Sequence, residues 1–395
     1  MGLLRRFSFP PLGYHARSLL VRRSSTLLTV VGIGATVAVL SGVLALQQGF
    51  STLFRDNGRE DVAVFLRPGA TSEGESAFPR ERAAILAKEL AEIARDAQGQ
   101  PLASGEVYLA VRRRKLDGGE TNVPIRGVQQ GTFAIAGARF RIVEGTTFTP
   151  GTDEVIVGQA LVERIQGCRV GEVLQLNTTP FRVVGVFALP GPFESEIWGD
   201  FDRMSPALER PEFSRVIAQL VPGADVKALA ARLEDDKRVP AKVMTERAYL
   251  SGQTQALSVV LIGLGVILAS LMGTAAVFTG TNTMMSAIAA RSHEIGILLS
   301  IGFHPLGVFL GFMFEALLLG LMGGALGCLM ALPIDGVRTG TTNFQTFTEV
   351  AFAFRITPTV LLVAVVFATG LGLLGGAYPA WRAARLRPTE ALRRV

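Results

Sequence analysis

The feature that most constrains this chain is the spacing of its four long apolar runs, at residues 27–46, 257–278, 305–332 and 359–379. Each holds about twenty residues or more, which lets an α-helix cross a hydrocarbon core of about 30 Å. About 210 mostly polar residues, 47–256, separate the first two runs, enough for one large domain or two small ones. The sequence therefore predicts an α-helical membrane protein with four transmembrane helices and a large extracytoplasmic α+β domain between helices one and two.

The distribution of charge predicts the orientation of these spans. The chain carries a net charge of +6, and one cluster of arginines precedes the first span while another follows the last one. They are Arg5, Arg6, Arg17, Arg22, Arg23, Arg382, Arg385, Arg387, Arg393 and Arg394, with Glu390 as the one acid among the C-terminal set. By the positive-inside rule both termini are cytoplasmic, and the segment 47–256 lies outside. Basic residues placed in this way do not indicate binding to nucleic acid.

The N-terminal residues 1–26 have two interpretations. Apolar residues among the arginines are typical of an interfacial helix on membrane lipid, but they also fit a basic flank that only sets topology. The run 27–46 is longer than the apolar core of a signal peptide, and no small-residue cleavage pattern follows it. We therefore expect an uncleaved first span.

The segment 47–256 alternates between patterns of strand and helix, which predicts two α+β subdomains. Expected strands lie at 61–66, 106–111, 122–128, 139–143, 153–157, 173–176, 181–189, 215–221 and 241–244, and expected helices at 79–97, 158–165 and 226–235. Residues 245–255 are polar and compatible with a helix, so we expect a continuous stalk that runs into the second span. Cys168 and Cys328 fall in different layers, so no disulfide is expected.

The sequence lacks the common motifs for nucleotide binding and for metal binding. It has no G-x-x-x-x-G-K-[ST] run to hold a nucleotide and no H-E-x-x-H or paired-cysteine pattern for a metal. His15, His293 and His304 are not spaced as ligands. Acidic residues near Trp198 favour a solvated loop over a catalytic pair; they are Glu194, Glu196, Asp200 and Asp202. We predict no catalytic residue, no metal site and no cofactor bound by this chain.

Within the third span, Glu315 is the informative residue. An ionisable group inside an apolar helix is costly and normally faces protein or water, so we expect it at a helix interface or a gate; a position near the inner interface is the alternative. The same run carries Gly320, Gly323, Gly324 and Gly327. Small residues at this spacing let another helix approach closely, within one chain or between two chains.

The cytoplasmic segment 279–304 contains a second informative pattern. Between residues 285 and 302, apolar side chains recur at helical spacing, with Arg291 and Glu294 among them. The pattern predicts a short amphipathic helix that is presented to a cytosolic partner. An external loop, 333–358, and a cytoplasmic tail, 380–395, complete the expected organisation.

Three motifs make the chain resemble the FtsX-like, MacB-type (type VII) ABC transporter permeases. The run from Arg291 to Gly302 (RSHEIGILLSIG) is similar to the coupling-helix motif of that family, although Leu299–Ser300 stand where many members have Arg–Ala. Glu315 through Gly324 is similar to the third span of the family, and Tyr378 to Leu392 (YPAWRAARLRPTEAL) to its C-terminal signature. In the long insert, residues 144–158 and 171–186 resemble the MacB-like core domain.

The resemblance implies a set of partners and site residues. Two permease chains, identical or related, would pair with an ABC ATPase made as a separate polypeptide, as in DevC-like exporters and lipoprotein-releasing permeases of the bacterial inner (plasma) membrane. The ATPase would bind ATP and Mg²⁺, and a periplasmic adaptor protein is a further expected partner. The residues expected to contact the ATPase are Arg291, Glu294, Ile295, Gly296 and Gly302. Those of the C-terminal signature, at the end of an FtsX-like permease domain spanning 257–395, are Pro379, Arg382, Arg385, Pro388 and Glu390.

The resemblance also implies a mechanism, which we state as an expectation. ATP-driven closure of the ATPase would push the coupling helix, and stiff spans would relay the motion to the external domain for export or extraction at the outer face of the membrane. Two alternatives share this architecture, namely release of lipoproteins and transmission of a signal to an external enzyme.

Overall fold

The computed structural model describes residues 23–342 and 348–387. The chain divides into two compact units, which we call the domain unit (residues 49–259 and 338–353) and the helical unit (23–48, 260–337 and 354–387 of the described chain). Most of the predicted N-terminal interfacial segment, and Pro388 and Glu390 of the C-terminal signature, lie outside the described residues.

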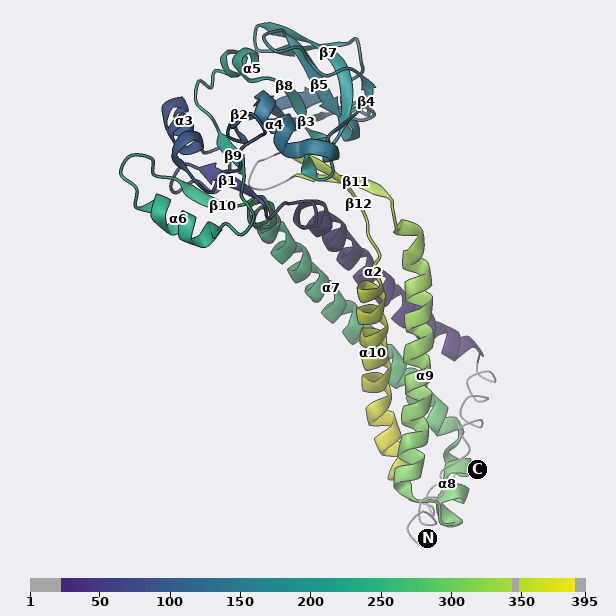
Figure 1. Cartoon of the computed structure of the whole chain (residues 1–395). Coiled ribbons are helices and arrows are strands. Elements are labelled where there is room, and N and C mark those ends of the chain that lie inside the picture. Colours follow the sequence, from purple (N-terminus) through teal and green to yellow (C-terminus); the bar gives the residue numbers. More distant parts are fainter. Residues whose placement is uncertain (1–22, 343–347, 388–395) are drawn as a thin grey trace. The chain divides into compact units, whose positions relative to one another are not determined.

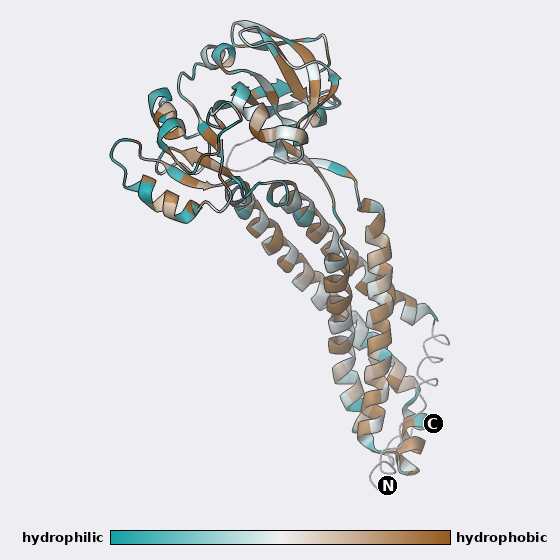
Figure 2. Ribbon diagram, viewed as in Figure 1, coloured by the Kyte–Doolittle hydropathy of each residue, from teal (hydrophilic) through white to brown (hydrophobic). Residues whose placement is uncertain are grey.

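Four of the described helices are long and apolar enough to cross a membrane, as the sequence predicts. They are α2 (Arg23–Arg55), α7 (Glu246–Ala290), α9 (Pro305–Ala331) and α10 (Pro358–Ala384). Figure 2 shows them as predominantly hydrophobic along their length. Two of them begin in the same way, with a capping side chain followed by proline at the first helical position, where its missing N–H has no intrahelical role. The caps are His304 before α9 and Thr357 before α10.

Helix α7 is continuous over 45 residues, which confirms the predicted stalk that runs into the second span (Figure 1). The predicted amphipathic helix that follows was placed too early, since residues 285–290 still belong to α7. The break falls at Arg291, whose backbone leaves the helical region at φ −111° and ψ 10°, and α8 then runs over Ser292–Ser300.

The domain unit is built on a sheet of ten strands. The order along it is β10-β1-β9-β2-β3-β8-β5-β7-β4, with β6 paired to β7. The long strand β2 (Ala103–Arg114) pairs with β9 through its first residues and with β3 through the rest, so it joins the two halves where the sequence predicts two subdomains. The remaining bounds are β1 Val62–Leu66, β3 Glu120–Val128, β4 Arg141–Gly145, β5 Glu154–Gly158, β6 Val173–Leu176, β7 Thr179–Ala188, β8 Ile197–Asp200, β9 Arg215–Gln219 and β10 Lys242–Thr245.

Short helices complete the domain unit: α3 Arg80–Glu89, α4 Gln130–Ala136, α5 Phe201–Ala207 and α6 Val226–Glu234, with 3₁₀ turns at η2 Gly137–Arg139, η3 Gln159–Leu161 and η4 Pro192–Ser195. Two predicted helices were too long. The one expected at 79–97 ends at Glu89, because residues 93–95 form β-bridges instead, and the one expected at 158–165 is the turn η3.

The segment 333–358, predicted as an external loop, also contains regular secondary structure. It starts with a 3₁₀ turn, η5 (Leu332–Ile334), and contains an antiparallel pair of strands, β11 (Arg338–Thr342) and β12 (Glu349–Ala353). These strands belong to the domain unit by their contacts, although they lie between α9 and α10 in the sequence.

The core of the domain unit also corrects the expected solvated loop near Trp198. Residues 197–200 form strand β8, and Trp198 is 1% exposed in a cluster of aromatic side chains. Its ring stacks on Phe140, with centroids 6.0 Å apart, and lies 4.8 Å from Phe187. Glu196 is buried beside it, so the acidic residues of this segment do not form one solvated group.

Candidate functional site

The predicted coupling helix α8 is held against the helical unit by one apolar face. Ile295 and Gly296 are buried, and Ile295 packs in a cluster with residues of α7, α9 and α10: Met284, Ile288, Val308, Phe312, Ala316, Ala380 and Ala383. The opposite face is exposed and carries Glu294 and the apolar side chain of Ile297. Just beyond the helix, Ile301 is 72% exposed. Such a face, partly apolar and not covered within the described chain, is suited to a protein partner.

Two residues that the sequence singled out separately lie together in the structure. The guanidinium group of Arg291, at the break between α7 and α8, lies 3.7 Å from a carboxylate oxygen of Glu315 on α9. Both side chains are nearly buried. The opposite charge of Arg291 lowers the cost of placing an acidic residue in α9. The pair ties the start of α8 to the third span.

The end of α8 is set by Gly302, another predicted coupling residue. Its φ is +103°, a backbone conformation that residues with a Cβ rarely adopt. A Cβ built at this position would have no neighbour within 4 Å. The chain then turns into α9, where the His304 ring accepts a hydrogen bond from the backbone N–H of Leu306 at 3.2 Å. Gly302 therefore shapes the turn that positions α8.

The predicted glycine stripe of α9 packs within the chain on two sides. A Cβ at Gly320 or Gly324 would meet α10 at Ala368, at 2.8 and 3.0 Å respectively. A Cβ at Gly323 or Gly327 would meet α2, at Ile33 and Val37 respectively, both at 2.6 Å. The sequence left open whether these glycines pack within one chain or between two chains. In the structure, all four pack against helices of the same chain.

The described part of the C-terminal signature ends α10. Pro379 lies inside the helix and is buried, while Arg382 is exposed in its last turn. Arg385 caps the helix, and its guanidinium group lies 4.3 Å from the centre of the Trp381 ring. Ala380 and Ala383, between these residues, pack in the cluster that holds α8.

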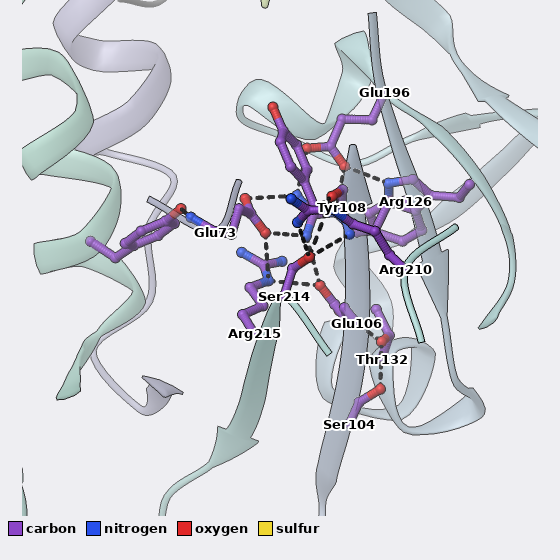
Figure 3. Close-up of polar contacts among 12 residues, drawn as sticks. Glu73, Ser104, Glu106, Tyr108, Arg126, Thr132, Glu196, Arg210, Ser214 and Arg215 are labelled. Carbon is purple, nitrogen blue, oxygen red and sulfur yellow. Dashed lines mark hydrogen bonds and ion pairs between the residues drawn. The ribbon is translucent and has the colours of Figure 1, made fainter. Parts of the chain in front are cut away.

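Sequence reasoning missed a second concentration of charge, which lies inside the domain unit (Figure 3). Three carboxylates and two guanidinium groups meet there, each on a residue that is 5% exposed or less: Glu73, Glu106, Glu196, Arg126 and Arg215. We call this group the buried charge cluster. Its members come from the loop after β1, from β2, β3 and β9, and from the residue before β8.

Arg126 is the centre of the buried charge cluster. Its Nε and Nη2 donate to Glu196 at 2.7 and 2.8 Å, and its Nη1 and Nη2 donate to Glu73 at 2.5 and 3.0 Å. Nη1 also donates to Glu106 at 3.0 Å, and Arg215 reaches the same Glu106 oxygen with its Nε at 2.7 Å. All five N–H groups of Arg126 therefore have carboxylate acceptors.

Opposite charges favour the ionised forms of Glu73 and Arg126. Burial alone would raise the pKa of the Glu73 carboxyl, but Arg126 and Arg215 outweigh that effect and its pKa lies below the usual value. Burial would likewise lower the pKa of Arg126, but Glu196 and Glu73 hold it well above the usual value. The cluster also reaches the stalk, because the backbone N–H of Glu73 donates to the Tyr249 hydroxyl of α7 at 3.2 Å.

The sequence did contain a trace of this cluster. Glu106, Arg126 and Arg215 each stand within or at the start of a strand that is otherwise rich in small and apolar residues, and strand residues on a buried face are normally apolar. A charged residue in such a place indicates a buried partner, although the strand itself does not identify that partner.

Comparison with known proteins decides the family. Residues 26–236 match the MacB-like periplasmic core domain, and residues 265–388 match the FtsX-like permease C-terminal region. The chain belongs to the MacB/FtsX family of ABC transporter permeases. The domain unit thus contains most of the MacB-like domain of the permease, and α8, Glu315 and the glycine stripe fall within its FtsX-like region.

Relatives of the permease extend over most of its length. The macrolide export ATP-binding/permease protein MacB of Sodalis glossinidius is 26% identical over 403 residues, covering 94% of this chain and 58% of that protein. The uncharacterized ABC transporter permease YknZ of Bacillus subtilis is 26% identical over 294 residues, covering 69% of this chain and 70% of that protein. The chain thus spans only somewhat more than half of its MacB relative.

Two solved structures resemble part of the permease. The extracellular domain of the ABC-type transporter YknZ covers 47% of this chain and 99% of that structure, at 18% identity and a TM-score of 0.35. The periplasmic region of MacB from Actinobacillus actinomycetemcomitans covers 49% of this chain and 92% of that structure, at 13% identity and a TM-score of 0.35.

Proposed function

We propose that this permease couples ATP hydrolysis on an ATPase subunit to export or extraction of a substrate at the outer face of a bacterial inner membrane. The ATPase docks on the exposed face of α8 from the cytoplasmic side. Its motion passes through α8 to the spans, and from α2 and α7 to the domain unit outside. Two permease chains form the working transporter, and the substrate does not travel through the spans.

The observation that carries this proposal is the way α8 is held. One face is buried against three other helices of the helical unit, and Arg291, the residue before α8, pairs with Glu315 on α9. A helix fastened in this way moves together with the spans when a partner pushes its exposed face. A loosely attached loop would absorb the same push, since an unpacked segment changes conformation at little cost.

Two cavities among the described residues of the domain unit support handling of substrate on its surface. One is about 20 Å³ and is lined by residues that include Arg126 and Tyr108; another is about 40 Å³ and is lined by residues that include Arg59 and Trp198. Each has room for a few water molecules at most, whereas pockets for drug-sized ligands measure about 300–1,000 Å³. These two small cavities favour binding of cargo or an adaptor protein on the outside of the domain.

The first experiment is to purify the tagged chain from its native membrane and to identify its companions by mass spectrometry. An ABC ATPase is expected to co-purify. An adaptor protein in addition favours export, a second related permease favours release of lipoproteins, and a peptidoglycan hydrolase favours signalling. If no ATPase is recovered under conditions that preserve the membrane complex, the proposal fails.

The exposed face of α8 is then tested with Glu294→Lys and Ile297→Asp, measured as ATP hydrolysis by the reconstituted complex. We expect each substitution to lower hydrolysis about tenfold or more, because charge complementarity and buried apolar anchors carry affinity at interfaces. Glu234→Lys makes the same charge change on the exposed face of α6 in the domain unit and should leave hydrolysis unchanged. Normal hydrolysis in both α8 variants would reject the docking site.

A further inference from the structure

The described residues between α9 and α10 include two strands that belong to the domain unit. β11 and β12 contact the rest of the domain unit along several residues, although in the sequence the main part of that unit lies between α2 and α7. Val350 and Phe352 of β12 are buried, and Phe352 lies edge-on against Phe50 at the end of α2, with ring centroids 5.4 Å apart. The backbone N–H of Ala351 donates to the hydroxyl of Ser195 at 3.2 Å.

An acidic residue at the start of β12 is clamped by two cations of the domain. Lys115, just after β2, places its Nζ 2.7 Å from one carboxylate oxygen of Glu349, and the guanidinium group of Arg164 contacts the other oxygen. The Glu349 side chain is 10% exposed, so solvent screens this arrangement much less than an ordinary surface ion pair. We call Glu349, Lys115 and Arg164 the hairpin clamp.

Neighbouring residues leave room for the hairpin clamp and extend it. A Cβ at Gly340, on β11, would overlap both the Arg164 guanidinium and the Glu349 carboxylate, so glycine at this position gives the clamp its space. Thr348 is 2% exposed and shares a side-chain hydrogen bond with Tyr108 on β2. The hairpin therefore reaches the strand that also carries Glu106 of the buried charge cluster.

The two other connections to the domain unit are fastened to each other. The backbone N–H of Arg59, just after α2, donates to Glu246 at the start of α7 at 3.0 Å, and the backbone N–H of Arg247 donates to the Arg59 carbonyl at 3.0 Å. A Cβ at Gly58 would lie 2.5 Å from the Arg247 Cα atom, which shows how closely these segments approach. The hairpin is a third and separate attachment.

We propose that the β11–β12 hairpin is a strap through which α9 and α10 also hold the external domain, and that Glu349 is its positioning residue. The strap makes all four spans act on the domain, so motion at α8, which packs against α9 and α10, reaches it by a route other than the stalk of α7. That the hairpin is attached to the domain is argued from the contacts described above. That it transmits motion depends also on the proposed function.

Docking is tested first, by hydrogen–deuterium exchange on the full-length chain in nanodiscs. Glu349→Gln and Glu349→Lys should speed exchange of the amides of residues 349–353 about tenfold or more, while amides of β9 stay protected. Glu349→Lys combined with Lys115→Glu and Arg164→Glu should restore protection to within about threefold of the wild type. Glu120→Lys, the same charge change on the neighbouring strand β3, should have no effect. Unchanged exchange in both Glu349 variants would overturn the clamp.

Transmission is tested in the complex with the co-purified ATPase, compared without nucleotide and after trapping with ADP and orthovanadate. In the wild type, exchange of the β2 amides should change at least threefold on trapping. In Glu349→Lys that change should be lost, while kcat and KM for ATP stay within about twofold of the wild type. A Glu349→Lys complex that responds like the wild type would overturn the strap. A wild-type complex with no response at all would instead count against the proposed function and leave the docking result standing.

Discussion

At the scale of single residues, Arg126 shows how much the domain depends on one side chain. Its five donors are divided among three buried carboxylates, and Arg215 is the other cation of the buried charge cluster. Lysine offers three donors on a point charge and cannot reproduce the planar fork of a guanidinium group. Removal of Arg126 leaves uncompensated negative charge in the core.

Arg126→Met should therefore lower the free energy of unfolding of the domain by about 3–5 kcal/mol, the usual range when one partner of a buried ion pair is removed. Arg126→Lys should recover only part of that loss. Arg112→Met is the matched control, because Arg112 is 75% exposed and pairs with Glu120 at 3.6 Å, which is worth about 1 kcal/mol or less. Denaturant unfolding of the full-length chain in detergent measures all three. Equal stability of the Arg126 and Arg112 variants would show that the cluster contributes little.

At the scale of elements, the packing of α9 against α10 depends on glycines of both helices. A Cβ at Gly372 on α10 would lie 2.6 Å from the Ala316 carbonyl oxygen and 2.8 Å from the Gly320 Cα atom. Backbone atoms cannot move aside as a flexible side chain can, so the helices would have to separate. Gly370, two residues earlier on the same helix, faces open space.

Gly372→Ala should thus destabilise the helical unit by about 1–3 kcal/mol, the range for added volume in a packed interior. Gly370→Ala should leave stability unchanged or raise it slightly, because alanine favours helix over glycine. Thermal unfolding of the purified permease in detergent, followed by loss of the monodisperse peak in size-exclusion chromatography, separates the two. A similar melting temperature for both variants would contradict the close approach of α9 and α10.

At the scale of the whole molecule, the proposed orientation places the domain on the outer side of the membrane and α8 on the cytoplasmic side. Asp117→Cys, at the exposed turn between β2 and β3, should react with a membrane-impermeant maleimide in intact spheroplasts. His293→Cys, on the exposed side of α8, should react only after permeabilisation. The parent chain is the control, because Cys168 is buried and Cys328 is half-buried. Labelling of His293→Cys in intact spheroplasts would overturn the orientation.

Features written in contiguous residues were predictable from the sequence. The four spans follow from long apolar runs, the stalk from helix-compatible residues that lead into one of them, and α8 from apolar periodicity next to Glu294. Such patterns report the environment of a segment, because burial in lipid or against a neighbouring helix acts on each turn of the helix in the same way.

Only the tertiary structure decided which residues meet. Arg126 lies 53 positions from Glu73, and Arg215 lies 109 positions from Glu106, so no local period connects them. Arg291 and Glu315 were both notable in the sequence, yet their pairing depends on how α7 and α9 pack. The hairpin clamp joins Glu349 to cations from the long insert. Which of these residues pair depends on how distant segments of the chain pack against each other, and a single sequence does not show that packing.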